Sequence, residues 1–222
     1  MGKTLFVSAH PDDETLGCGG TILKLKASGE QIYWLILTNI NEADGWNKQT
    51  VEERQKEIET VSGLYGFEQT SKLDFPTARL DTIPDNDLIA AISNAINMVK
   101  PHTLFLSNRS DIHTDHQVAF KSVISCTKNF RFPFIKKVLM YECLSETEFA
   151  SPLPETAFTP NVHIDITDHL EKKLEIMKTY KSEVMPPPGP RSLNTIKALA
   201  RYRGSRIGVE YAEAFMLIQE IL

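Results

Sequence analysis

The sequence has 222 residues, of which 41% are hydrophobic and 24% charged, the usual balance of a globular protein. Its 24 basic and 29 acidic residues give a formal charge of −5, which argues against nucleic acid as a partner. Three scattered cysteines are too few for a disulfide framework, and no apolar stretch is long enough for an integral membrane segment. We therefore expect one domain over 1–222 in the cytoplasm, and the composition leaves homo-oligomerisation open.

Strand and helix patterns alternate along the chain, beginning with a β-branched and aromatic strand at 4–9 and a helix at 15–26. The small residues of this helix, Gly17, Gly19 and Gly20, are expected to let it pack close to a sheet. A strand at 31–38, a polar loop at 39–48, a helix at 51–65, a strand at 72–75, a helix at 85–99 and a strand at 103–106 follow. The chain continues with a helix from 117, strands at 137–142 and 162–166, helices at 168–181 and 193–202, and an apolar segment at 211–218. The alternation predicts an α/β sandwich with a mostly parallel sheet.

The most informative segment is Ala9-His10-Pro11-Asp12-Asp13-Glu14-Thr15, which closes the first strand and opens the first helix. A helix N-terminus needs one acidic cap, whereas this turn holds a histidine and three acids. His10 and Asp13 are three residues apart at the turn, so their side chains can face the same point. Ligands of open α/β sheets bind at the carboxyl ends of strands, and we expect a functional site here.

A second cluster, Asp111-Ile112-His113-Thr114-Asp115-His116, follows the strand at 103–106 and precedes the helix from 117. In a parallel sheet the carboxyl ends of the strands share one edge, so the two clusters can converge. Imidazole and carboxylate ligands together suit zinc, with three protein ligands and a fourth position for water. The residues therefore predict a catalytic metal site of His10 and Asp13, completed by His116 or His113.

The remaining groups suggest a hydrolytic reaction. Zinc lowers the pKa of a water that it binds to about 7, and Asp12, which projects differently from Asp13, is expected to hold a proton from that water. The histidine that is not a ligand is expected, as a cation, to stabilise an oxyanion or protonate a leaving amine. Asp115 is expected to orient an imidazole. Together these roles predict hydrolysis of an amide or an ester.

Each of these residues also has a plainer interpretation when it is taken singly. Asp12 or Asp13 alone would cap a helix, and His113 and His116 alone would be polar residues of a loop. Their joint placement at two strand ends is what favours a metal site.

The chain resembles the LmbE-like, or PIG-L, family of zinc-dependent N-deacetylases. The resemblance rests on the segment at 9–14, on His113-Thr114-Asp115-His116, and on Tyr202-Arg203-Gly204 with Gly208 and Tyr211-Ala212-Glu213-Ala214-Phe215. Many members carry proline where this chain has Thr114, and the usual Ser-Gln pair of the family is Ser182-Glu183 here. The likeness extends over nearly the whole chain.

The resemblance implies a Rossmann-like three-layer sandwich in which His10, Asp13 and His116 hold Zn²⁺. It implies Asp12 as general base, His113 as the group that assists at the oxyanion and the leaving amine, and Arg54 as a substrate contact. The family acts mostly on N-acetylglucosamine groups attached to larger scaffolds. The implied reaction removes acetate from a small-molecule amino-sugar conjugate and leaves a free amine.

Two alternatives remain open on the sequence. A metal-dependent amidase or esterase on another acyl conjugate would use the same residues. A non-catalytic module that grips a metal–nucleotide complex would use the carboxylates but has no need of an uncoordinated Asp12.

Overall fold

Short buried segments form the seven strands of one sheet in the computed structural model, which describes residues 2–222. The strands are β1 (Lys3–Ser8), β2 (Gln31–Asn39), β3 (Gln69–Pro76), β4 (Thr103–Ser107), β5 (Lys137–Tyr141), β6 (Val162–Asp165) and β7 (Ala212–Glu220). The helices are α1 (Asp13–Ala27), α2 (Lys48–Tyr65), α3 (Asp85–Val99), α4 (Thr114–Ser125), α5 (Leu170–Met177) and α6 (Leu193–Ser205), with short 3-10 turns at Glu42–Asp44 and Leu80–Thr82. Among these described residues no helix has the length and apolarity that crossing a bilayer requires.

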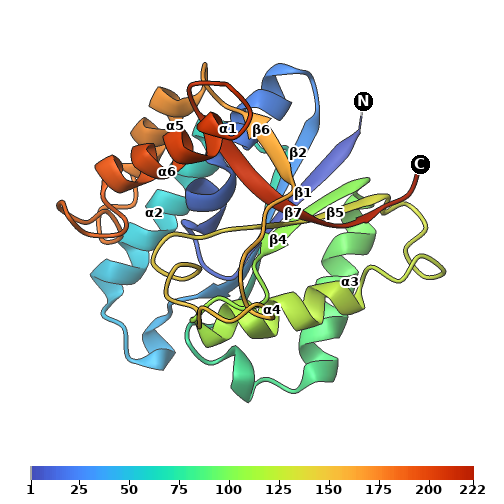
Figure 1. Cartoon of the computed structure of the whole chain (residues 1–222). Helices are drawn as coiled ribbons and strands as arrows, with labels where there is room; N and C mark the ends of the chain where they lie inside the picture. The colour runs from blue at the N-terminus through green and yellow to red at the C-terminus, as the bar shows by residue number, and fades with distance from the viewer. Residues whose placement is uncertain (1) are drawn as a thin grey trace.

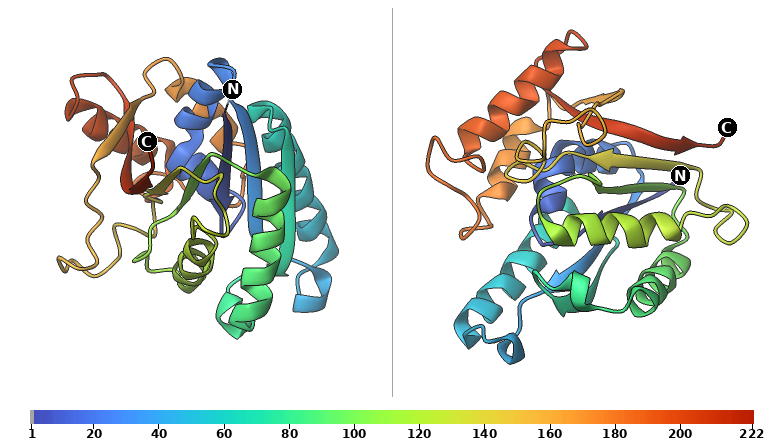
Figure 2. Two further views of the ribbon diagram at one scale, coloured as in Figure 1. Left: turned by 90° about the vertical axis from the view of Figure 1, so that its right-hand side faces the viewer. Right: turned by 60° about the horizontal axis from the view of Figure 1, so that its bottom comes forward.

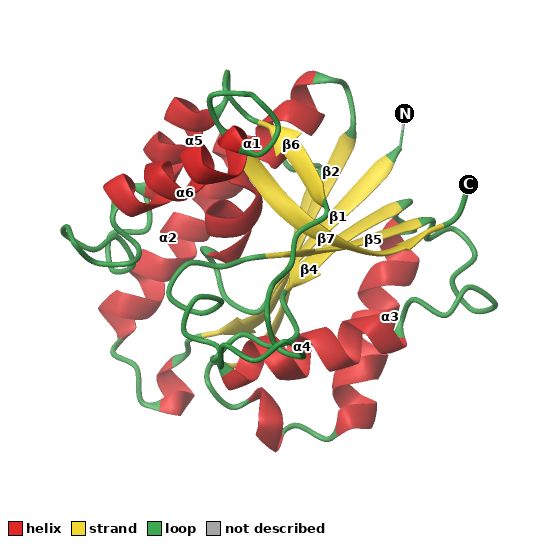
Figure 3. Cartoon of the chain, viewed as in Figure 1, coloured by secondary structure: helices red, strands yellow, loops and turns green. Residues whose placement is uncertain are grey.

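The strand order is β3-β2-β1-β4-β5-β7-β6, and the first five strands pair in parallel. β7 runs antiparallel to both β5 and β6, so the predicted mostly parallel sheet is confirmed (Figure 3). The chain moves outward from β1 to β3 in one direction and from β4 to β5 in the other. The order therefore reverses between β1 and β4, which is where sheets of this kind bind ligands.

Two layers of helices cover the sheet (Figures 1 and 2). Phe6 packs with α1, α2, α5 and α6 on one face, whereas Leu5 and Val7 pack with α3 and α4 on the other. Neighbouring residues of β1 thus point to opposite faces, as the pleat of a strand requires. Both faces are buried, which explains why the central strands are continuous apolar runs rather than alternating ones. The predicted three-layer sandwich is confirmed.

Some boundaries differ from those that the sequence predicts. α4 begins at Thr114 rather than at 117, because the Nδ1 of His113 accepts a hydrogen bond from the backbone N–H of Asp115 and caps the helix. α5 ends at Met177, four residues before the predicted end. The earlier start of α4 places His116 on a helix instead of in a loop.

The glycines of α1 allow the close approach that the sequence predicts. A Cβ on Gly17 would collide with the Tyr141 ring and lie 2.8 Å from the carbonyl oxygen of Glu142, and one on Gly20 would lie 2.7 Å from Ile166. In the same region the buried Glu213 carboxylate of β7 accepts hydrogen bonds from the backbone N–H groups of Gly20 and Thr21. β7 therefore holds α1, the helix that begins at the acidic turn, directly against the sheet.

We expect Gly17→Ala to destabilise the protein by about 1–3 kcal/mol, because the added methyl group overfills a packed contact. Gly63→Ala is the matched control, since Gly63 lies within α2 and a Cβ there would meet nothing within 4 Å. That control should instead stabilise the protein by about 0.5–1 kcal/mol through helix propensity. Urea unfolding of both variants measures the difference, and equal effects would contradict the close packing of α1.

Candidate active site

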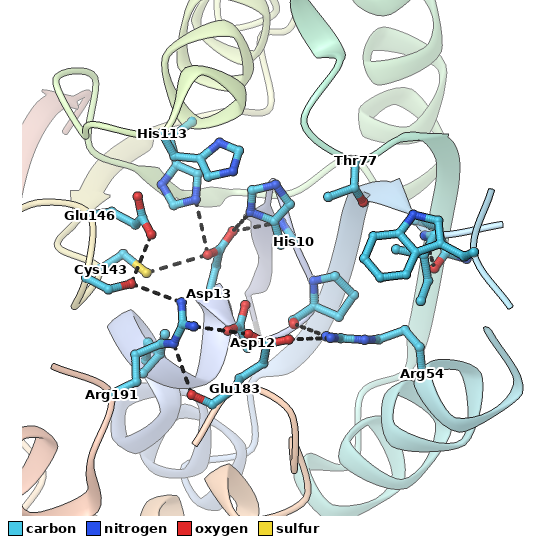
Figure 4. Close-up of a pocket in the computed structure, with 17 residues that line it drawn as sticks. His10, Asp12, Asp13, Arg54, Thr77, His113, Cys143, Glu146, Glu183 and Arg191 are labelled. Carbon is cyan, nitrogen blue, oxygen red and sulfur yellow. Dashed lines mark hydrogen bonds and ion pairs between the residues drawn. The ribbon is translucent and has the colours of Figure 1, made fainter. Parts of the chain in front are cut away.

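A cavity of about 200 Å³ opens at the carboxyl ends of β1 and β4, where the strand order reverses. It is lined by residues of the two predicted clusters, of helix α2 and of the connections that follow β2, β3, β5 and α5 (Figure 4). These residues are His10, Pro11, Asp12, Asp13, Leu16, Asn39, Ile40, Trp46, Arg54, Thr77, His113, His116, Cys143, Ser145, Glu146, Glu183 and Arg191. The two clusters, about a hundred residues apart in sequence, therefore meet as predicted.

The turn between β1 and α1 fixes Asp13 against two imidazoles. One carboxylate oxygen of Asp13, Oδ2, accepts the backbone N–H of His10 at 2.8 Å and lies 3.9 Å from Nδ1 of the same histidine. The other oxygen, Oδ1, lies 3.2 Å from Nε2 of His116 and 3.5 Å from Sγ of Cys143. Both oxygens of this buried carboxylate thus face the space between His10 and His116.

Asp12 sits in the same turn with its carboxylate free. Its φ of 131° lies in a region that non-glycine residues rarely adopt. The backbone N–H of Asp12 donates to Oε2 of Glu14 at 3.1 Å, and the carbonyl oxygen of Asp12 accepts the N–H groups of Thr15 and Leu16. Within residues 2–222, no hydrogen bond or ion pair reaches the Asp12 carboxylate, which lines the cavity. The backbone holds a strained conformation that directs an unbonded carboxylate into the cavity.

Glu14, the third acid of the turn, is a structural residue. It is fully buried, and its Oε1 accepts hydrogen bonds from the hydroxyl groups of Thr15 and Tyr180 at 2.5 and 2.8 Å. Burial raises the pKa of Glu14 to about 7. The Tyr65 hydroxyl donates to that of Thr15 at 3.0 Å, so a buried chain of hydroxyl groups supports the turn from α2 and the segment after α5.

The N-terminus of α4 supplies the second half of the site. Nδ1 of the buried His116 lies 2.8 Å from Oδ2 of Asp111, which fixes the ring with Nε2 toward Asp13. Within residues 2–222, the buried Nε2 has no hydrogen-bond partner, and it forms an ion pair with Oδ1 of Asp13 at 3.2 Å. The Nδ1 of His113 accepts the N–H of Asp115, so the hydrogen of a neutral His113 is on Nε2.

Asp115 lies behind the site rather than in it. Its buried carboxylate is 3.0 Å from Nε2 of His10 and accepts the backbone N–H groups of Ala78 and Leu80 at 2.7 and 3.0 Å. It does not line the cavity. Asp115 thus contacts the His10 ring from outside the cavity lining, a geometry that fits the predicted role of orienting an imidazole.

Two sets of side chains bring three ligand atoms within 4.8 Å of one another, His10 with Asp13 and His116, and His10 with His113 and Asp115. The second set is the poorer metal site, because the Asp115 carboxylate already accepts two backbone hydrogen bonds and faces the far nitrogen of His10. In the first set, the outer nitrogens of both histidines face carboxylates, which leaves Nδ1 of His10 and Nε2 of His116 directed inward. Partners of this kind fix the tautomer of metal-binding histidines.

The electrostatics of the site favour a positive charge beside Asp13. Although burial opposes its ionisation, the imidazoles of His116 and His10 hold the pKa of Asp13 below its usual range. Burial also disfavours a charged His116, yet the carboxylates of Asp13 and Asp111 raise its pKa well above the ordinary value. Burial and then the charge of Asp13 raise the pKa of Asp12.

His113 differs from the sequence expectation of a cationic group. Burial, followed by the nearby His10 and His116, lowers the pKa of His113 to about 4. At neutral pH the ring is therefore uncharged and offers an N–H donor to the cavity rather than an imidazolium.

The side of the cavity below the acidic turn carries two arginines (Figure 4). Arg54 of α2 donates to the carbonyl oxygen of Pro11 at 3.0 Å and pairs with Glu183 and Glu57. Glu183 also pairs with Arg191, at 3.4 Å. The guanidinium group of Arg54, the expected substrate contact, is therefore engaged with the protein and supports the turn that carries Asp12.

Sequence reasoning gave no role to several residues of the site. The Asp111 carboxylate, five residues before His116, could have been recognised as a partner for that ring, because residues at such spacing meet around a helix N-terminus. Cys143, Glu146 and Arg191 come from loops without any periodic pattern, and only the fold brings them to the cavity.

A model of the PIG-L family, described as GlcNAc-PI de-N-acetylase, matches residues 5–127, which include both clusters. The diacetylchitobiose deacetylase of Thermococcus kodakarensis is 24% identical over 226 residues, covering 99% of this chain and 84% of that protein. The crystal structure of a conserved protein from Thermus thermophilus superimposes with a TM-score of 0.79 at 27% identity, over 100% of this chain and 97% of that one. The 4-carboxy-2-hydroxymuconate hydratase of Pseudomonas putida shares the fold, with a TM-score of 0.74 at 18% identity over 100% and 98% of the two chains.

The buried contacts of Glu14 predict how its substitution affects stability. Glu14→Ala leaves three buried donors without their acceptor and should lower the free energy of unfolding by about 3 kcal/mol or more. Glu14→Gln keeps the shape and one acceptor oxygen, and should cost about 1 kcal/mol. Urea unfolding compares both with Glu59→Ala on the exposed face of α2. A Glu14→Ala protein as stable as that control would show that the hydroxyl chain does not support the turn.

Proposed function

The chain belongs to the PIG-L family, and from this premise we propose that it is a zinc-dependent N-deacetylase. The proposed reaction hydrolyses the N-acetyl group of an N-acetylglucosamine-type amino sugar or its conjugate and releases acetate and a free amine. The observation that carries the proposal is the buried Nε2 of His116, which has no hydrogen bond and faces the Asp13 carboxylate beside the unbonded carboxylate of Asp12. The deacetylase activity of the Thermococcus relative supports it.

We assign Zn²⁺ to His10, Asp13 and His116. Two imidazoles and one carboxylate are a donor set that zinc enzymes use, with a position left over for substrate or water. The orphaned Nε2 fits this role, because a buried nitrogen without a hydrogen bond is costly unless another group occupies its lone pair. When bound, the ion would supply a Lewis acid that favours ionisation of water and polarises an amide carbonyl.

The position of each side chain in the cavity suggests its role in proton transfer or in contact with the acetyl group. Asp12 accepts the proton of the attacking water, since its carboxylate is free and enters the cavity next to Asp13. The neutral His113 donates its Nε2–H to the oxygen of the acetyl group as negative charge develops there. The proton held by Asp12 then passes to the leaving nitrogen, which departs as the free amine. Arg54 holds the Pro11 carbonyl and so keeps the turn in place.

The wall opposite Arg191 offers a surface for a sugar ring. Trp46, 46% exposed, lines the cavity together with Asn39 and Thr77. An indole provides an apolar face, and the amide and hydroxyl groups provide partners for ring hydroxyls. We assign this wall to the sugar of the conjugate.

The fold alone does not decide the reaction, because the Pseudomonas putida hydratase has the same architecture. An amidase or esterase for a larger acyl group would use the same residues, and so would a module that binds a metal–nucleotide complex without turnover. The last of these predicts nucleotide binding that survives Asp12→Asn.

We expect the purified, zinc-loaded protein to release acetate from N-acetylglucosamine glycosides or from N,N′-diacetylchitobiose, with one free amine per acetate. Coupled acetate detection and an amine-reactive dye measure the two products. N-propionyl, N-butyryl and O-acetyl analogues tested in parallel separate deacetylation from a broader amidase or an esterase. A loaded protein that releases no acetate from any N-acetylated sugar would contradict the proposal.

Substitutions should separate zinc ligands from catalytic groups. His10→Ala and His116→Ala are expected to lose bound zinc, as measured by elemental analysis after dialysis. Asp12→Asn and His113→Ala should retain zinc while turnover falls by about 100- to 10,000-fold, the range for a lost proton acceptor or oxyanion donor. His102→Ala, which alters an exposed histidine outside the cavity, is the control. Full zinc content in His116→Ala would overturn the ligand assignment.

A further inference from the structure

The turn after β5 places a carboxylate in the cavity that the proposed chemistry does not use. Glu146 lines the cavity, and its only side-chain hydrogen bond within residues 2–222 comes from the Ser145 hydroxyl to Oε1 at 2.9 Å. No cationic side chain of these residues pairs with it within 4 Å. Oε2 is therefore an acceptor without a protein donor, in a partly buried position.

The position of Glu146 relative to the proposed metal ligands is fixed by two contacts. The backbone N–H of Ile112 donates to the Glu146 carbonyl oxygen at 3.2 Å. The hydroxyl group of Thr147 donates to Oδ1 of Asp111 at 2.7 Å, and Asp111 in turn orients His116. The turn that carries Glu146 is thus attached to the same segment that positions the ring of His116.

A second set of contacts, from Arg191 through Ser145, holds the side chain of Glu146. Arg191 donates through Nε to the Glu183 carbonyl oxygen at 3.0 Å and through Nη1 to the Ser145 hydroxyl at 3.1 Å. Because the Ser145 hydroxyl accepts a hydrogen bond from Arg191, its own hydrogen is directed to Glu146. Ser145 has a φ of 75°, and the Glu148 carboxylate accepts its backbone N–H at 2.7 Å. The strained turn and the relay leave Oε2 of Glu146 free to meet a ligand.

Resting on the proposed deacetylase function, we propose that Glu146 is a specificity-determining residue that accepts a hydrogen bond from a ring hydroxyl of the substrate sugar. Figure 4 shows Glu146 across the cavity from Thr77, with His10 and Asp13 between them, and Trp46 lines the same cavity. A sugar whose acetamido group reaches Asp13 then has one edge toward Glu146. The carboxylate selects hydroxylated rings, because an acceptor that is partly removed from water stays unpaired when the hydroxyl is missing.

The test combines Glu146 variants with deoxy sugars. Methyl N-acetyl-β-glucosaminide and its 3-, 4- and 6-deoxy analogues are compared in wild-type protein, Glu146→Gln, Glu146→Ala and Ser145→Ala. We expect one deoxy position to lower kcat/KM of the wild type by about 10- to 100-fold, the effect of losing a hydrogen bond to a charged acceptor. In Glu146→Ala the same deoxy position should have no effect, and Glu146→Gln should be intermediate. Ser145→Ala, which keeps the carboxylate but loses its relay, should lose less than Glu146→Ala.

Binding and zinc content separate this inference from the function on which it rests. Isothermal titration of the same sugars into Asp12→Asn protein should reproduce the selectivity without turnover, and Asp12→Asn/Glu146→Ala should abolish it. Zinc content and melting temperature of the Glu146 variants should match those of Glu155→Gln, a change on an exposed loop. If acetate is never released but the binding selectivity depends on Glu146, the deacetylase proposal fails and this inference stands. The inference about Glu146 would be overturned if each deoxy sugar lost the same fraction of kcat/KM with and without Glu146. Loss of zinc in Glu146→Ala, or no binding of any sugar, would also overturn it.

Discussion

Because β1 pairs in parallel with β4, with Thr4 beside Thr103 and Phe6 beside Phe105, the acidic turn and the N-terminus of α4 start from one edge of the sheet. This register is set by the core rather than by the site. Phe6 belongs to one buried layer and Leu5 to the other, so a slip of one residue would exchange the two faces. The distance between Asp13 and His116 is therefore a consequence of how the apolar strands pack.

The carboxylates of the two clusters have different hydrogen-bond partners. The two with the fewest donors, Asp12 and Asp13, are the ones that line the cavity. The Asp115 carboxylate accepts hydrogen bonds from backbone N–H groups, and the Glu14 carboxylate accepts them from hydroxyl groups. The Asp111 carboxylate contacts the side chains of Asn108, Thr147 and His116. Asp12 and Asp13 are left facing the cavity, with the arginines on that side already paired to glutamates. In the proposed site, a cation between Asp13 and His116 would relieve this arrangement, and a proton on His116 would compete for the same position. Such competition is the physical link between metal affinity and pH in histidine–carboxylate sites.

The sequence predicts those parts of the molecule that depend on the hydrophobic pattern of neighbouring residues. The 3.6-residue stripe of α3 and the apolar runs of β1 and β4 set the elements, and the strand-end clusters indicate where the cavity forms. The sequence could not predict that Asp111 contacts the His116 ring and Asp115 the His10 ring. These contacts depend on the rotation of α4, which begins three residues earlier than its apolar pattern indicates. The pairing of Arg54 with Glu183 and the relay from Arg191 to Glu146 join helix α2 with two loops that are distant in the chain, and no spacing in the sequence encodes those contacts.

The proposed metal ligands and the walls of the cavity lie on structurally separate parts of this molecule. The proposed ligands lie on the β1–α1 turn and on α4, which two buried layers and the Glu213 contact hold in place. The walls that would meet the substrate, around Trp46, at Ser145–Glu146 and at Glu183–Arg191, come from connections whose sequences are free of core constraints. Loops of this kind can change without disturbing the centre they surround. A fold built on this plan can therefore keep the side chains at its strand ends while the loops that line the cavity change.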